Sequence, residues 1–169
     1  MLQIFCGNGK GKTSAATGSA VRAAGAGMQV IFVQFLKDGS SSEISQLEKL
    51  GIKVMSDGCR KFVFHMSEEE KADLRKVQEG LLRAVEKELT EGSADMIILD
   101  EFAAAYRLGL LDRELASDLI LSHKNKAELI LTGRDPDPVF LENADYISQI
   151  EAVRHPYEKG IRARKGVEY

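Results

Sequence analysis

The chain of 169 residues contains no tryptophan and only two cysteines, Cys6 and Cys59. Two cysteines cannot build the disulfide framework of a small secreted protein, so we expect a reducing, cytoplasmic environment. The sequence also lacks an apolar run of about 18–20 residues, the length that a membrane-spanning helix requires. Its first residues lead directly into a motif, and we therefore expect no signal peptide. These absences argue against a secreted or membrane-embedded protein.

An excess of positive charge is also missing. The chain has 23 Lys and Arg against 26 Asp and Glu, a formal net charge of −3, which argues against nucleic-acid binding or an anionic membrane as its main partner. The charge is unevenly distributed, because residues 154–169 carry five basic and two acidic side chains. This basic segment is either simply solvated or serves a polyphosphate or a partner subunit. The length predicts one domain, residues 1–169, that includes the basic segment.

Short apolar runs alternate with helical patterns along the chain. The runs are nearly continuous rather than alternating, which is typical of strands buried on both faces of a parallel sheet. The alternation predicts an α/β fold with a mostly parallel central sheet flanked by helices. The expected strands include residues 2–6, 28–36, 96–99, 127–131 and 145–153, and the expected helices include 13–26, 67–91 and 112–121.

The most informative motif is the glycine-rich segment GNGKGKT at residues 7–13, between the first expected strand and the first helix. Glycines let backbone N–H groups point toward anionic oxygens, and the helix N-terminus adds positive potential. Lys12 adds a full charge, and the hydroxyl of Thr13 could reach a bound Mg²⁺. Cys6 stands where the strict pattern has its first glycine. The alternative is an ordinary glycine-rich turn.

Two further expected strands end in charged residues. Asp100 and Glu101 follow the buried run 96–99, where such folds place an acid near Mg²⁺. The alternative is that Asp100 caps the next helix and Glu101 is solvated. Arg134 follows the run 127–131 and could grip a phosphate with two N–H groups, or it could be an ordinary surface arginine. Strand ends of a parallel sheet meet at one edge, so we expect these residues near the glycine-rich loop.

Several segments occur along the chain in this order: GNGKGKT (7–13), VRAAGAG (21–27), VQFLK (33–37), ILDE (98–101), LTGR (131–134), HP (155–156) and KGVEY (165–169). Together they resemble the P-loop-type ATP:corrinoid adenosyltransferases, which act on cob(I)alamin or cob(I)yrinic acid a,c-diamide. The resemblance spans nearly the whole chain, and members of this family also lack the first loop glycine.

The resemblance implies a RecA-like fold and an enzyme that transfers the 5′-deoxyadenosyl group of ATP to the Co(I) of a corrinoid, releasing triphosphate. It also implies residue roles. Lys12, Thr13 and Glu101 would be catalytic, and Thr13 and Glu101, with Asp100 nearby, would hold Mg²⁺ or Mn²⁺. The residues expected to contact ATP are Gly7, Asn8, Gly9, Lys10, Gly11, Lys12, Thr13, Ser14, Arg22 and Arg134.

The same resemblance implies a site for the corrinoid. In this family, aromatic side chains displace the lower axial ligand of cobalt, and the matching positions here are Phe62 and Phe64, where the family often has Phe-x-Trp. The alternative is that the two phenylalanines form a small core cluster. The resemblance further implies a homodimer and a small flavoprotein as reductant. Two other functions stay open: a P-loop phosphotransferase such as a small nucleoside kinase, and a non-catalytic, ATP-dependent corrinoid carrier or sensor.

Overall fold

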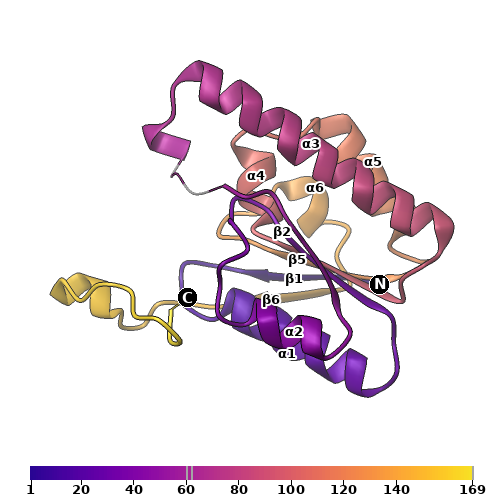
Figure 1. Cartoon of the computed structure of the whole chain (residues 1–169), viewed down its shortest axis with the longest axis horizontal. Coiled ribbons are helices and arrows are strands. Elements are labelled where there is room, and N and C mark those ends of the chain that lie inside the picture. Colours follow the sequence, from indigo (N-terminus) through magenta and orange to yellow (C-terminus); the bar gives the residue numbers. More distant parts are fainter. Residues whose placement is uncertain (60, 62, 169) are drawn as a thin grey trace.

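The chain folds around a six-stranded sheet in which every neighbouring pair of strands is parallel (Figure 1). The computed structural model describes residues 1–168 except 60 and 62, so the predicted role of Phe62 lies outside the described residues. The strand order is β3-β2-β4-β5-β1-β6. The strands are β1 (Leu2–Cys6), β2 (Val30–Gln34), β3 (Lys53–Ser56), β4 (Met96–Asp100), β5 (Glu128–Thr132) and β6 (Tyr146–Gln149).

Helices cover both faces of this sheet, as the continuous apolar strands predict (Figure 1). All five residues of β2 and of β4 are buried. One face packs against α1 (Lys12–Gly25) and α2 (Ile44–Lys49), and alanines of α1 let that helix lie close to the strands. The other face packs against α3 (Glu68–Glu91), α4 (Phe102–Arg107), α5 (Arg113–His123) and α6 (Pro138–Leu141).

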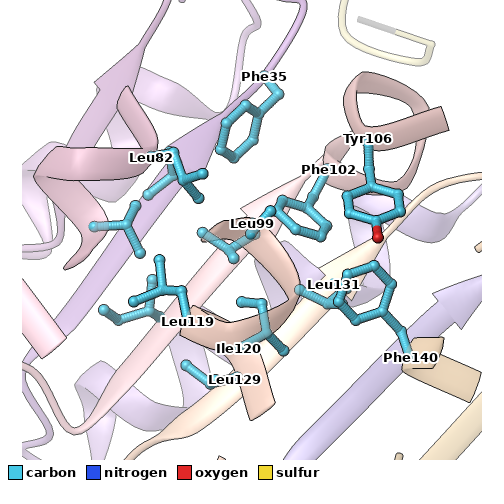
Figure 2. Close-up of a cluster of buried hydrophobic side chains, with 14 of the residues drawn as sticks. Phe35, Leu82, Leu99, Phe102, Tyr106, Leu119, Ile120, Leu129, Leu131 and Phe140 are labelled. Carbon is cyan, nitrogen blue, oxygen red and sulfur yellow. The ribbon is translucent and has the colours of Figure 1, made fainter. Parts of the chain in front are cut away.

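Aromatic rings pack together within the core on the second face, beside leucine and isoleucine side chains (Figure 2). The ring of Phe102 lies 5.7 Å from that of Phe35 and 5.4 Å from that of Phe140, both in edge-to-face geometry. Tyr106 stacks on Phe102 at 6.1 Å and also meets the edge of Phe140 at 4.9 Å. This packing anchors α4, the short helix that begins directly after Glu101, and thereby fixes the carboxyl end of β4.

The sequence-based boundaries agree with most elements, with two differences. Helix α3 begins after Ser67, as predicted, with a capping box in which Ser67 and Glu70 exchange side-chain to backbone hydrogen bonds. The last strand is shorter than the predicted range 145–153, because the chain beyond Gln149 turns across the glycine-rich loop. Helix α4 was not predicted.

The topology brings the carboxyl ends of β1, β2, β4 and β5 to one edge of the sheet. Strand β5 lies between β1, which leads into the glycine-rich loop, and β4, which ends in Asp100. The C-terminal segment after β6 extends away from the body, where Figure 1 shows it in yellow.

Candidate functional site

The glycine-rich loop is packed tightly against the segment that follows β6. A Cβ atom on Gly7 would lie 2.4 Å from the carbonyl oxygen of Ile150, and one on Gly9 would lie 2.7 Å from the carbonyl carbon of Glu151. The N–H of Gly7 donates to Arg134 O at 3.0 Å, and that of Gly9 donates to Ile150 O at 2.8 Å. Side chains at these two positions would therefore push the loop off the sheet edge.

The N-terminus of α1 can bind an anionic ligand. The first N–H groups of a helix have no acceptor within the helix, and α1 begins at Lys12 after Gly11, which has no side chain to cap them. The Lys12 ammonium donates to Gly9 O at 2.8 Å, so the side chain lies along the loop. Burial lowers the pKa of Lys12, while the nearby Glu101 carboxylate opposes that shift. The loop thus presents positive potential at the sheet edge.

Asp100 is the centre of a buried hydrogen-bond network. Its side chain is fully buried, and its Oδ1 accepts from the hydroxyls of Thr13 at 2.9 Å and Thr132 at 2.7 Å. Its Oδ2 lies 2.6 Å from the ammonium of Lys37, which also donates to Thr13 Oγ1 at 3.3 Å. The alternative in which Asp100 only caps the next helix is therefore wrong.

Glu101 has a different environment from its neighbour. Its backbone is left-handed, with φ 58°, and its N–H donates to Thr132 Oγ1 at 2.9 Å. Within the described part of the chain, its carboxylate accepts no hydrogen bond. Burial, and secondarily the charge of Asp100, raise the pKa of Glu101, while Lys37, Lys12 and Arg134 oppose this shift. Glu101 is therefore the acid of this pair that is free to bind a ligand.

Gly133 controls the position of the next charged residue. A Cβ atom here would lie 2.4 Å from the Cβ of Ala103 at the start of α4. This close approach brings Arg134 beside the loop, where its carbonyl accepts the N–H of Gly7. The Arg134 side chain is exposed and lines a cavity together with Glu101.

That cavity, about 830 Å³ in volume, adjoins the site and is also lined by Lys37. One part of its wall is apolar and another is charged. Phe64 lies on the wall and is 85% exposed. The alternative that Phe64 belongs to a small core cluster is therefore wrong. The lining residues are Leu36, Lys37, Asp38, Ser40, Ser41, Cys59, Lys61, Val63, Phe64, Glu101, Ala103, Ala104, Arg107, Leu108, Arg134 and Asp135.

Comparison with known proteins agrees with this geometry. The family model for "ATP:corrinoid adenosyltransferase BtuR/CobO/CobP" matches residues 1–169. The chain belongs to the ATP:corrinoid adenosyltransferase family. The corrinoid adenosyltransferases of Escherichia coli K12 and Pseudomonas aeruginosa are 33% and 30% identical to it, over the whole of this chain and 85% and 83% of those proteins.

A solved structure supports the fold alone. The flagellar accessory protein FlaH from Methanocaldococcus jannaschii matches with a TM-score of 0.54 and 16% identity, over 88% of this chain and 69% of that one. The likeness, together with the parallel sheet, confirms the predicted RecA-like α/β fold.

Most of the predicted site residues of this adenosyltransferase-family chain lie together. The loop, Asp100, Glu101 and Arg134 share one sheet edge, and Phe64 lies on the wall of the adjoining cavity. Arg22 is apart from them, exposed in the last turn of α1, about two and a half helical turns beyond Thr13.

Three polar residues at this edge were not predicted as site residues. Lys37 and Thr132 bind Asp100 directly. Gln34, the last residue of β2, is fully buried, and both polar atoms of its side chain lack a partner within the described residues. Gln34 and Thr132 are the last residues of parallel strands, and Lys37 follows β2 closely, so the rule that predicted Asp100 could have indicated them.

Proposed function

We propose that the chain transfers the 5′-deoxyadenosyl group of ATP to the Co(I) of a corrinoid. The observation that carries this proposal is that two features of the site adjoin each other. A cationic loop lies with carboxylates at the sheet edge, and beside it lies a half-apolar cavity of about 830 Å³. In the reaction, the two electrons of the Co(I) nucleophile form the Co–C5′ bond. The bond between C5′ and the α-phosphate oxygen breaks, and triphosphate leaves.

The loop residues act on the leaving group. The triphosphate gains negative charge as the C5′–O bond breaks, and preorganised N–H donors and cations stabilise such charge in a site that excludes water. The residues in this role are Gly7–Ser14, which include the Lys12 ammonium and the start of α1. The protein needs no general base, because the attacking cobalt has no proton to lose.

The oxygen atoms at the sheet edge fit a divalent cation. Mg²⁺ is usually bound by one or two carboxylates together with substrate phosphates, and Mn²⁺ accepts the same ligands. Thr13 and Glu101 would hold the ion, which neutralises phosphate charge when bound. Both carboxylate oxygens of Asp100 already have partners, so Asp100 would orient the Thr13 hydroxyl. It would reach the ion directly only with Lys37 displaced. Arg134 would contact the phosphates and Arg22 the nucleoside.

The half-apolar cavity is the proposed corrinoid site. An aromatic side chain that is 85% exposed, as Phe64 is, gains free energy when a large apolar ligand covers it. Phe64 and Phe62 would displace the lower axial ligand of cobalt, since axial ligation sets the potential at which Co(II) is reduced.

Other properties expected from the sequence stay predictions. These are a single unit over residues 1–169 with its basic segment 154–169, a homodimer, a small flavoprotein reductase and a cytoplasmic location. Among the described residues, no helix is both long and apolar enough to cross a membrane.

The direct test is incubation with ATP, Mg²⁺ and chemically reduced cob(I)alamin while the corrinoid absorbance is followed. We expect adenosylcobalamin and an equal amount of triphosphate, with a large loss in Lys12→Ala and none in the exposed control Lys76→Ala. Steady formation of ADP without adenosylcorrinoid would refute the proposal and favour a phosphotransferase. Tight binding of ATP and corrinoid without turnover would also refute it and favour a carrier.

A further inference from the structure

A carboxylate outside the nucleotide site joins three separate segments of the chain. Asp57, which directly follows β3, accepts the backbone N–H of Leu36 and the side-chain amide of Gln78 at Oδ2. Its Oδ1 accepts the N–H of Cys59 at 2.7 Å. The residue is partly buried, so these donors replace much of its contact with water. Asp57 therefore connects the end of β2, the segment after β3 and helix α3.

The bond to Leu36 lies where the backbone is strained. Leu36 has φ 57°, a left-handed conformation that costs a residue with a Cβ about 1–2 kcal/mol. Such a conformation persists only where the surroundings enforce it. The Asp57 carboxylate accepts the N–H of this very residue, and so it helps to hold the turn that β2 makes before Lys37.

The direction of that turn determines where Lys37 lies. Its ammonium reaches Asp100 at 2.6 Å and Thr13 at 3.3 Å, so Lys37 joins the β2 end to the proposed phosphate site. Asp57 also accepts the N–H of Cys59, a residue that lines the cavity.

The side chain of Gln78 supports the position of Asp57. It is the one fully buried polar side chain of α3 among the described residues, and its amide nitrogen is used on Asp57. Its Oε1 has no partner within the described part of the chain. Burying an amide with an unsatisfied oxygen costs about 1–3 kcal/mol, and among the described residues the Asp57 carboxylate is the one polar partner of this side chain.

We propose that Asp57 is a positioning residue of the adenosyltransferase: through Leu36 it directs Lys37 onto Asp100. It acts through Lys37 rather than on a substrate. The kinetic test of this role rests on the proposed function, whereas the contacts that support the role do not depend on it.

A double-mutant cycle tests this path. We expect Asp57→Asn and Lys37→Met each to lower kcat/KM for ATP about 10- to 100-fold, because misplacing a site group by about 1 Å costs that much. The double variant should be no worse than Lys37→Met alone, since one change removes what the other acts on. Losses that multiply would overturn the proposal, because a merely structural role of Asp57 is independent of Lys37.

The matched control is Asp95→Asn. Asp95 also accepts a backbone N–H, that of Gln29 at 2.8 Å, but at the opposite edge of the sheet. We expect Asp95→Asn to lower kcat/KM for ATP only slightly, and we expect its effect to multiply with that of Lys37→Met. If Asp57→Asn does not fold, Gln78→Met, which keeps the side-chain volume and removes the amide donor, replaces it in the cycle with the same criterion.

A second readout separates this proposal from the proposed function. If the unaltered protein transfers no adenosyl group, the same cycle is measured as the Kd for ATP with Mg²⁺ by calorimetry. Non-additive losses of affinity then support the positioning role although the reaction assignment fails, and additive losses overturn it.

Discussion

The ion pair between Lys37 and Asp100 allows a sharp prediction about stability. The carboxylate of Asp100 is fully buried, whereas the side chain of Lys37 is 25% exposed. In Lys37→Met the buried carboxylate loses its compensating cation, and in Asp100→Asn the orphaned ammonium can still reach water. We therefore expect the lysine substitution to be the more destabilising of the two.

The magnitude follows from the burial of each partner. Removing one partner of a buried pair costs about 3–5 kcal/mol, and the partial exposure of Lys37 favours the lower end, about 3 kcal/mol. For a chain of this length each kcal/mol lowers Tm by about 2–4 °C, so Lys37→Met should lose roughly 6–12 °C. Asp100→Asn keeps an oxygen that can accept from Thr13 and Thr132, and should cost about 1–2 kcal/mol.

The assay is urea unfolding of the ligand-free protein, followed by circular dichroism, for both single variants and the double variant. Lys37→Met/Asp100→Asn has no buried charge at this place, so it should recover most of the loss seen in Lys37→Met. A double variant as unstable as Lys37→Met, or a larger loss in Asp100→Asn than in Lys37→Met, would refute the reasoning.

Three further outcomes follow from the site. Gly133→Ala overpacks the contact with Ala103 and should cost about 1–3 kcal/mol in urea unfolding; an unchanged midpoint would contradict the packing. Phe64→Ala should leave stability within about 0.5 kcal/mol but raise the KM for the corrinoid about 10-fold, for loss of roughly 1.4 kcal/mol of apolar contact. Burial raises the pKa of Glu101, so its folded form binds a proton more tightly than the unfolded chain. The unfolding free energy should therefore rise as pH falls through that raised pKa, and Glu101→Gln should abolish this rise and stabilise the protein at neutral pH while removing activity.

The fold and half of the site could be predicted because their signals are local. Continuous apolar runs identify the strands of a parallel sheet, and the spacing of glycines and Lys12 identifies an anion-binding loop. The position of Asp100 and Glu101 required only the rule that strand ends meet at one edge. Helix α4 was missed because six residues are too few to show helical periodicity, and aromatic packing on Phe35 and Phe140 stabilises it instead.

The remaining parts of the site depend on contacts that the sequence does not encode locally. Asp57 and Gln78 are 21 residues apart, and Lys37 and Asp100 are 63 apart. The left-handed conformation of Leu36 carries no glycine or asparagine signal. A short-range pattern cannot reveal such partners, since each side chain taken alone is typical of a solvated loop or a helix surface.

The two adjacent acids at the end of β4 illustrate how one short motif can hold two functions. Successive side chains of a strand point to opposite faces, so Asp100 and Glu101 could not both face the same ligand if the strand continued. The chain instead leaves the extended conformation at Glu101, whose left-handed backbone is held by the bond from its N–H to Thr132. Asp100 stays in the buried network, and Glu101 turns to the cavity. The Thr132 hydroxyl donates to the Asp100 carboxylate and accepts the backbone N–H of Glu101. Substituting Thr132 by valine should therefore disturb stability and ligand binding together, whereas changes at either acid should separate them.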